Sequence, residues 1–247
     1  MSASLILDLH DMERTRRPDE LYSWVMAKCD ELGATSDSKA FSRLGALLPK
    51  KFYDEFYPLA LFVKREFSGR DDISVKPHLG NDNFDAQITF NDKASAIGRT
   101  IFVEITYAKD GYDESRRMEI LSRDGHVNWT GPVSSSGRKR SSDRNVHVKN
   151  EANSHLAALK KHFAIVKKRL QDKTLPRRYG KDHVLVVAVD DYLILRNSSN
   201  VDQFRDAVTS WLPALPLDFC RVVFVGASGQ LFESFAVTGL SSYSSAR

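Results

Sequence analysis

Cysteine is scarce in this chain, and long apolar runs are missing. The two cysteines, Cys29 and Cys220, are far apart, lie among apolar residues and match no metal-binding spacing. They exclude a disulfide framework and predict buried thiols in a reducing compartment. No stretch approaches the roughly 18 apolar residues of a membrane span, and the apolar run before Asp8 is too short for a secretory signal. We therefore expect a cytoplasmic protein with no membrane partner.

A glycine-rich phosphate loop is also missing, which weakens one reading of the chain as a nucleotide-binding α/β protein. That reading would use the carboxyl ends of two apolar strands, residues 183–191 and 221–227. Hydrophobic residues make up 42% of the 247 residues, enough for a sizeable core, and general disorder is excluded. The length fits one large domain or a domain with an elaboration.

Positive charge is concentrated in one region. Residues 137–182 hold fourteen Lys or Arg and four Asp or Glu, a balance of +10 within a total of +4, so the rest of the chain is at −6. Such segregation is the electrostatic footprint of a polyanionic partner, although a solvated basic helix gives the same pattern. The candidate nucleic-acid-binding residues are Arg138, Lys139, Arg140, Lys149, Lys160 and Lys167.

The hydrophobic period changes along the chain. Helical spacing predicts helices over residues 19–32 (capped by Gly33), 38–48 (ending before Pro49), 52–67 (kinked at Pro58), 112–124, 151–173 and 201–212. Alternating or continuous apolar segments predict strands over residues 74–79, 84–90, 101–108, 183–191, 221–227 and 231–237, the last at the sheet edge. We expect an α/β fold with a mixed central sheet flanked by helices. Residues 1–50 would form a helical extension, 51–240 the α/β domain, with an inserted loop or hairpin over 111–150, and 241–247 a disordered tail.

Two carboxylates interrupt the neighbouring strands at 84–90 and 101–108. Asp85 belongs to the polar side of the first, and Glu104 stands within the apolar segment IFVEITYA of the second. Strands this close in sequence normally pair, so both carboxylates can project from one side of the sheet. Like charges at that spacing need a cation or a proton, and carboxylates suit Mg²⁺ or Mn²⁺. The alternative is a pair of solvent-facing residues, which a charge in so apolar a strand disfavours.

This order of elements resembles the PD-(D/E)XK nuclease superfamily, which has a restriction-endonuclease-like core. The resemblance covers about residues 50–191 and rests on the helix 52–67, Asp85 in NFDAQI, Glu104 in FVEIT, the helix 151–173 and the strand HVLVVAVDD. It implies a Mg²⁺ held by Asp85, Glu104 and the carbonyl of Ile105. It also implies hydrolysis of phosphodiesters by a water that the family's Glu-x-Lys lysine polarises.

The chain departs from the family at Thr106, which stands where the lysine belongs. The resemblance leaves open which residue replaces it, and the candidates are Lys109, Lys149, Lys160 and Gln87. A further acid can come from the first helix of the family's core, where Glu55 or Glu66 would serve.

Three other features have two readings each. Arg116 and Arg117 can reach a phosphate beside the metal or make ordinary surface helix pairs. Trp129 can stack on a base or pack the insertion onto the core. Asp190 and Asp191 end a buried strand at the carboxyl edge, where α/β folds place ligands, but such residues more often cap the loop.

The sequence thus predicts a metal-dependent, nuclease-like enzyme that acts on DNA or RNA, with nucleic acid as its partner and a homodimer as one possible assembly. The alternative is a catalytically inactive nuclease-like domain that binds nucleic acid or a protein, and Thr106 is its main support.

Overall fold

The computed structural model describes residues 6–34, 47–80, 82–91, 99–127, 131–136, 145–149, 154–174, 179–192, 195 and 197–237. The helices are α1 (Leu9–Met12), α2 (Pro18–Gly33), α4 (Leu47–Lys51), the π-helix η2 (Phe52–Phe56), α5 (Tyr57–Phe67), α6 (Gly111–Asp124), α7 (His155–Gln171), α8 (Ser198–Trp211) and the 3-10 helix η3 (Leu212–Ala214). The strands are β1 (Ile73–Pro77), β2 (Ala86–Phe90), β3 (Arg99–Ala108), β4 (Val133–Ser136), β5 (Asn145–Val148), β6 (His183–Val189), β7 (Arg221–Gly226) and β8 (Phe232–Ala236). Across these ranges, no helix combines the length and the apolar character needed to cross a membrane.

A mixed six-stranded sheet in the order β1-β2-β3-β6-β7-β8 forms the centre of the molecule. The β1–β2, β2–β3 and β7–β8 pairs are antiparallel, and the β3–β6 and β6–β7 pairs are parallel. The predicted α/β class with a mixed sheet is therefore confirmed, and so is the edge position of the last strand. At the other edge of the sheet, Val75 of β1 forms an isolated antiparallel bridge with the backbone of Arg16.

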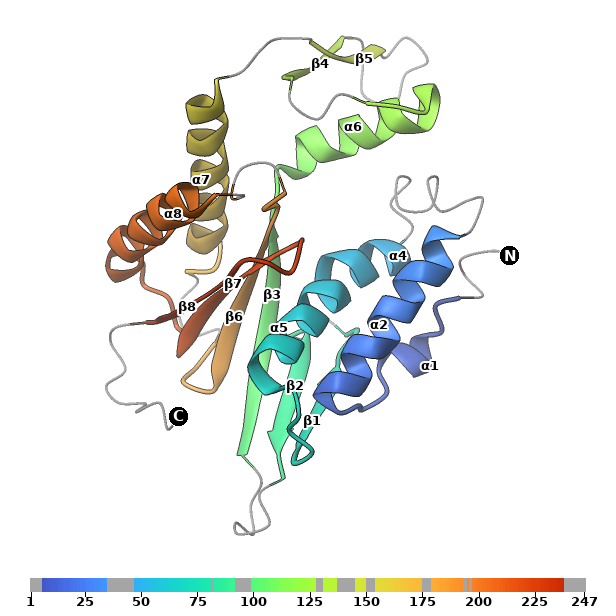
Figure 1. Ribbon diagram of the computed structural model, residues 1–247, viewed down its shortest axis with the longest axis vertical. Helices are drawn as coiled ribbons and strands as arrows, with labels where there is room; N and C mark the ends of the chain where they lie inside the picture. Colours follow the sequence, from blue (N-terminus) through green and yellow to red (C-terminus); the bar gives the residue numbers. More distant parts are fainter. Residues whose placement is uncertain are drawn as a thin grey trace.

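Helices cover the two faces of this sheet unequally (Figure 1). On one face, α2 and α5 pack against the strands in one core, which includes Leu21, Phe62, Ile88 and Val103, and β8 adds the partly buried Phe232 at its margin. On the other face, α7 and α8 pack on β6 and β7, and β3 adds Ala108 near its end. Within the described residues, β1 and β2 contribute nothing to this second core. The face of the sheet around β1, β2 and the first part of β3 is thus less covered on the α7 side.

Helix boundaries differ from the sequence prediction at two places. Gly33 does not cap α2 in a left-handed conformation; it is the last helical residue, and Ala34 closes the helix with right-handed geometry. Pro49 lies inside α4 instead of ending a helix before it, because a proline in the first turn of a helix removes no needed hydrogen bond. Of the helix predicted over 38–48, residues 38–46 lie outside the described ranges.

The predicted irregularity at Pro58 is confirmed and takes the form of a π-turn. Pro58 has no N–H to donate to the carbonyl of Asp54, and its ring would clash there. The helix widens instead: the N–H of Tyr57 donates to the carbonyl of Phe52, five residues back, and α5 then continues with Pro58 in its first turn. The extra residue changes the direction in which the side chains of η2 point.

The insertion after β3 consists of α6 and the antiparallel β4–β5 hairpin, which lie beyond the end of the sheet (Figure 1). Asp110 caps the start of α6, and Gly125 ends it at φ 74°, as predicted. Arg116 donates to Ser135 Oγ at 2.6 Å, and Arg117 donates to the carbonyl of Gly131. Both arginines therefore fasten the hairpin to α6. Trp129 and the predicted phosphate-binding residues Arg138, Lys139 and Arg140 lie outside the described ranges.

The long basic helix α7 begins at His155, after Ser154 caps the N–H of Ala157 at 3.2 Å. Its buried stripe holds Leu159, Val166 and Leu170. Leu156 lies in the first turn, before this stripe begins, and is 56% exposed. Lys160 and Lys167 are exposed, and Lys167 lies 5.6 Å from the ring centre of Trp211.

Candidate functional site

Asp85 lies at a bend just before β2, not on the strand where the alternation had placed it. Its N–H donates to the carbonyl of Val103, while its own carbonyl accepts from His78 N–H, each at 2.8 Å. In a regular antiparallel strand, the N–H and the carbonyl of one residue point to the same neighbouring strand. Those of Asp85 point to opposite sides, so the chain is locally bulged here. Bulges re-aim side chains, and the Asp85 carboxylate turns to the edge of β3, where Oδ2 accepts the N–H of Ile105 at 2.7 Å.

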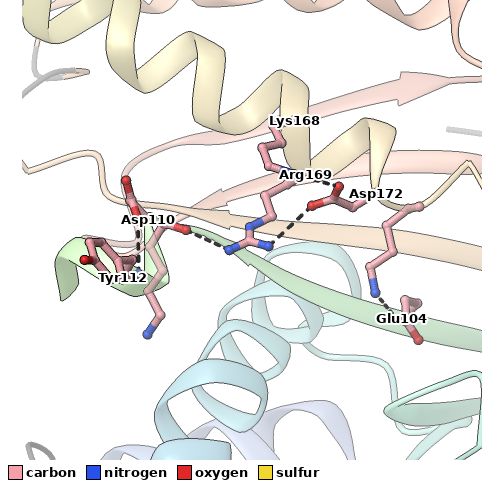
Figure 2. Close-up of polar contacts among 8 residues, drawn as sticks. Glu104, Asp110, Tyr112, Lys168, Arg169 and Asp172 are labelled. Atoms are coloured by element: carbon pink, nitrogen blue, oxygen red, sulfur yellow. Dashed lines mark hydrogen bonds and ion pairs between the residues drawn. The ribbon is translucent and has the colours of Figure 1, made fainter. Parts of the chain in front are cut away.

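Glu104 lies in the middle of β3, opposite Leu185 of β6 and on the α7 side of the sheet. Only 7% of its surface is exposed. Its Oε1 accepts hydrogen bonds from the Lys173 ammonium group and, at 3.3 Å, from the Tyr179 hydroxyl. Figure 2 shows Glu104 beneath the C-terminal end of α7, near Arg169 and Asp172. The charge that interrupts the apolar strand is therefore balanced by a lysine from a distant part of the chain.

Ile105 supplies backbone groups to the same place. Because β2 begins only at Ala86, the edge of β3 beyond Val103 has no β2 residue opposite it in the ladder. Ile105 N–H donates to Asp85 at this edge, and in an extended strand the carbonyl of the same residue points to the same side. The carbonyl of Ile105 therefore faces the same edge of β3 as the Asp85 carboxylate.

The two strand carboxylates repel each other. Burial and, after it, the negative charge of Glu104 raise the pKa of Asp85 to about 6. The Ile105 N–H, Lys173 and Lys51 act in the opposite direction. With this pKa, Asp85 gains or loses its proton close to neutral pH, and such shifted pKa values are typical of functional sites.

Glu55 on the π-helix η2 adds a third acid. Burial raises its pKa to about 8, and the charge of Asp85 is the next cause. Lys51 lies 3.5 Å from Glu55 Oε2 and opposes the shift, but this buried oxygen makes no hydrogen bond with the described residues. The alternative acid, Glu66, pairs with Arg221 at 2.7 Å. Of the two acids considered from the sequence, Glu55 is therefore the one whose pKa is raised by the charge of Asp85.

Lys173 is the lysine that contacts the carboxylate of Glu104, and the sequence analysis did not identify it. It follows the end of α7, 69 positions after Glu104 in the chain. The one available signal was its place as the last residue of the predicted helix 151–173. Lys109, considered in this role, pairs with Asp54 at 2.6 Å instead.

The remaining candidates lie at varied places. Gln87 is half-buried on β2, opposite Phe102. Lys149 and Lys160 are exposed, and Lys149 donates its N–H to the carbonyl of Pro132 at 3.0 Å. Thr106 is half-buried on β3, two residues beyond Glu104.

The chemistry of these groups suits a hard divalent cation. Across the described part of the chain, no three His, Cys, Asp or Glu side chains lie close enough to hold a metal ion together. The ligands available are instead the carboxylates of Asp85 and Glu104 and the Ile105 carbonyl, all oxygen donors of the kind Mg²⁺ prefers. Burial and mutual repulsion raise the pKa values of Asp85 and Glu55, and Oε2 of Glu55 makes no hydrogen bond within the described residues, so a cation at these carboxyl groups would favour their charged forms. The residues present therefore fit such an ion.

Comparisons with models of protein families, with curated proteins and with solved structures give no match for this chain.

Proposed function

We propose that this protein is a metal-dependent nuclease with a restriction-endonuclease-like core, which hydrolyses phosphodiester bonds of DNA or RNA at Asp85 and Glu104. The observation that carries the proposal is the contact of Lys173 with Glu104, beside the Asp85 carboxylate. Lys173 supplies the positive charge that the family's Glu-x-Lys lysine would provide and that Thr106 cannot. Helix α5, strands β1 to β3, helix α7 and strand β6 follow one another in the order expected for such a core.

Each group has a role in this reaction. Asp85, Glu104 and the Ile105 carbonyl would hold Mg²⁺ or Mn²⁺. The ion would supply Lewis acidity and stabilise the charge that develops on the phosphate. Lys173 orients the attacking water and neutralises charge beside it. Glu55, with its pKa near 8, is able to hold a proton at neutral pH and to exchange it with the site. The exposed Lys160 and Lys167 of α7, and Lys149, would attract the phosphates of the substrate in a salt-dependent manner.

The test is a cleavage assay on plasmid DNA and on single-stranded DNA and RNA, with Mg²⁺ or Mn²⁺. We expect the wild type to cut, and Asp85→Asn, Glu104→Gln and Lys173→Met each to lose on the order of 100-fold or more in rate. Two exposed residues give matched controls, Asp206→Asn on α8 and Lys168→Met on α7, and both should cut like the wild type.

Two results would count against the proposal. Cleavage that survives in Asp85→Asn would place the chemistry elsewhere. A wild type that cuts no substrate but binds nucleic acid with strong salt dependence would support the inactive nuclease-like domain in its place.

A further inference from the structure

A row of aromatic rings begins beside the acidic residues and crosses the sheet on its less covered side. Phe102 lies two residues before Glu104 on β3, on the same face, and opposite His183 of β6. The two rings are stacked with centroids 5.0 Å apart and planes at 25°. Phe84 lies over Phe102 at 4.8 Å, and His78 lies 5.1 Å from Phe84. We name Phe84, Phe102 and His183 the aromatic row.

The local backbone explains how the row forms. Regular alternation along β2 would direct Phe84 to the α5 side, with Ala86 and Ile88. The bulge at Asp85 breaks that alternation, so Phe84 meets Phe102 on the other face. The same bend therefore aims the Asp85 carboxylate at β3 and places a ring beside it.

These rings are not sealed into a core. All three are half-buried, and none belongs to either of the two large apolar clusters. Gln87 and the exposed Lys76 continue the same cross-strand row on β2 and β1. Three partly exposed rings beside an amide and a lysine, outside both apolar clusters, are typical of a binding surface.

The charge around the row favours a polyanion. A surface depression of about 530 Å³ lies at the start of β3 and β6, lined by Arg99, Thr100, Lys181 and Asp182. It is next in the chain to Phe102 and His183, and Phe102 N–H donates to the carbonyl of Asp182 at 2.8 Å. From Glu104 to Arg99, β3 spans about 17 Å at the usual rise of a strand. Acidic site, rings and basic depression thus follow one another along β3.

We propose that the aromatic row stacks the bases of a single-stranded nucleic-acid segment that leads to Asp85 and Glu104, so that unpaired strands are the preferred substrate. This inference rests on the proposed function for its location. Bases within a duplex hide their faces from side chains, whereas unpaired bases offer them to aromatic rings, and the backbone then follows the cations.

The test is a binding titration by fluorescence anisotropy, with labelled oligothymidylate, oligouridylate and a DNA duplex, in EDTA. Base stacking is worth roughly 5- to 150-fold in affinity per base. We expect Phe102→Leu and Phe84→Leu to weaken single-strand binding within that range and to leave duplex binding unchanged. Phe102→Tyr keeps the ring and should restore affinity. Phe235→Leu, a half-buried phenylalanine on the distant strand β8, is the matched control and should bind like the wild type.

Salt dependence separates stacking from a general loss of structure. Phe102→Leu removes no phosphate contact, so the slope of log affinity against log salt should stay that of the wild type. Single-strand binding unchanged in Phe102→Leu, or lost equally for the duplex, would overturn the inference. Because EDTA prevents metal-dependent cleavage, this result is independent of whether Asp85→Asn abolishes cutting, which decides the proposed function.

Discussion

Removing the ammonium group of Lys173 should destabilise the protein through Glu104. In Lys173→Met, a carboxylate that is 7% exposed keeps the Tyr179 hydroxyl, at 3.3 Å, as its remaining hydrogen-bond donor among the contacts described above. Breaking a buried ion pair by removing one partner costs about 3–5 kcal/mol. The Lys173 side chain is 22% exposed, which lets water replace part of the interaction, so we expect about 3 kcal/mol. In a chain of this size that lowers the melting temperature by about 6–12 °C.

Urea unfolding in EDTA measures the change, and three comparisons interpret it. Glu104→Gln with Lys173→Met should recover most of the loss, because the uncompensated charge is gone. Lys168→Met removes an exposed pair with Asp172 from the same helix and should cost less than about 1 kcal/mol. Added Mg²⁺ should shrink the loss in Lys173→Met, because a cation at Asp85 and Glu104 takes over the role of the ammonium. A Lys173→Met protein within about 1 kcal/mol of the wild type would refute the reasoning.

Three further predictions concern other buried groups. The pKa of Glu55 is raised from 4.5 to about 8, so its protonated form stabilises the fold below pH 4.5 and that stability is lost as the pH rises through 8. Melting temperatures from pH 5 to 9 without metal should therefore fall in the wild type relative to Glu55→Gln, and parallel curves would contradict this. Asp191, 3% exposed, accepts from the N–H of Ser228 at 2.8 Å and from its hydroxyl, so Asp191→Ala should cost about 3 kcal/mol in urea unfolding; a loss under 1 kcal/mol would show that water replaces it. A Cβ at Gly226 would lie 2.1 Å from Asp191 Oδ2, so Gly226→Ala should cost about 2 kcal/mol or more, whereas a change near zero would mean that the loop shifts freely.

Local pattern predicted most of the fold because it is set by neighbours in the chain. The alternation in FDAQITF and IFVEITYA predicted β2 and β3, and their closeness in sequence predicted that they pair; their antiparallel direction comes from the structure. The continuous apolar segment HVLVVAV predicted the buried strand β6. The loop-capping role considered for Asp190 and Asp191 is met by Asp191, which accepts from the turn between β7 and β8. The predicted strand began at residue 84, whereas β2 begins at Ala86 and Asp85 lies at the bend before it, because a bulge leaves no trace in the hydrophobic period.

The candidate site was harder to predict because its partners meet only in the folded chain. Asp85 and Glu104 could be paired from adjacent strands, but Lys173 reaches Glu104 from 69 positions away, and no periodicity links the two. Glu55 and Glu66 have the same residue type on one predicted helix, and only packing shows that one faces Asp85 and the other Arg221. Arg116 and Arg117 could be considered as phosphate ligands because the sequence does not show that they bind Ser135 and the Gly131 carbonyl.

The π-turn before Pro58 ties the position of the third acid, Glu55, to the packing of η2 in the core. A π-turn is an α-helix with one residue inserted, and deleting one residue restores the α-helical register. Each residue turns an α-helix by about 100°, so such a deletion would rotate everything before Tyr57, Glu55 included, relative to α5. Phe62, Val63 and Phe67, which bury α5 against the sheet, would keep their facing. Phe52 and Phe56 of η2, which are buried in the same core, would turn together with Glu55. In descendants or engineered forms of this chain, a single-codon deletion would thus move an acidic group at the site only together with two buried rings, and the core itself conserves the π-turn.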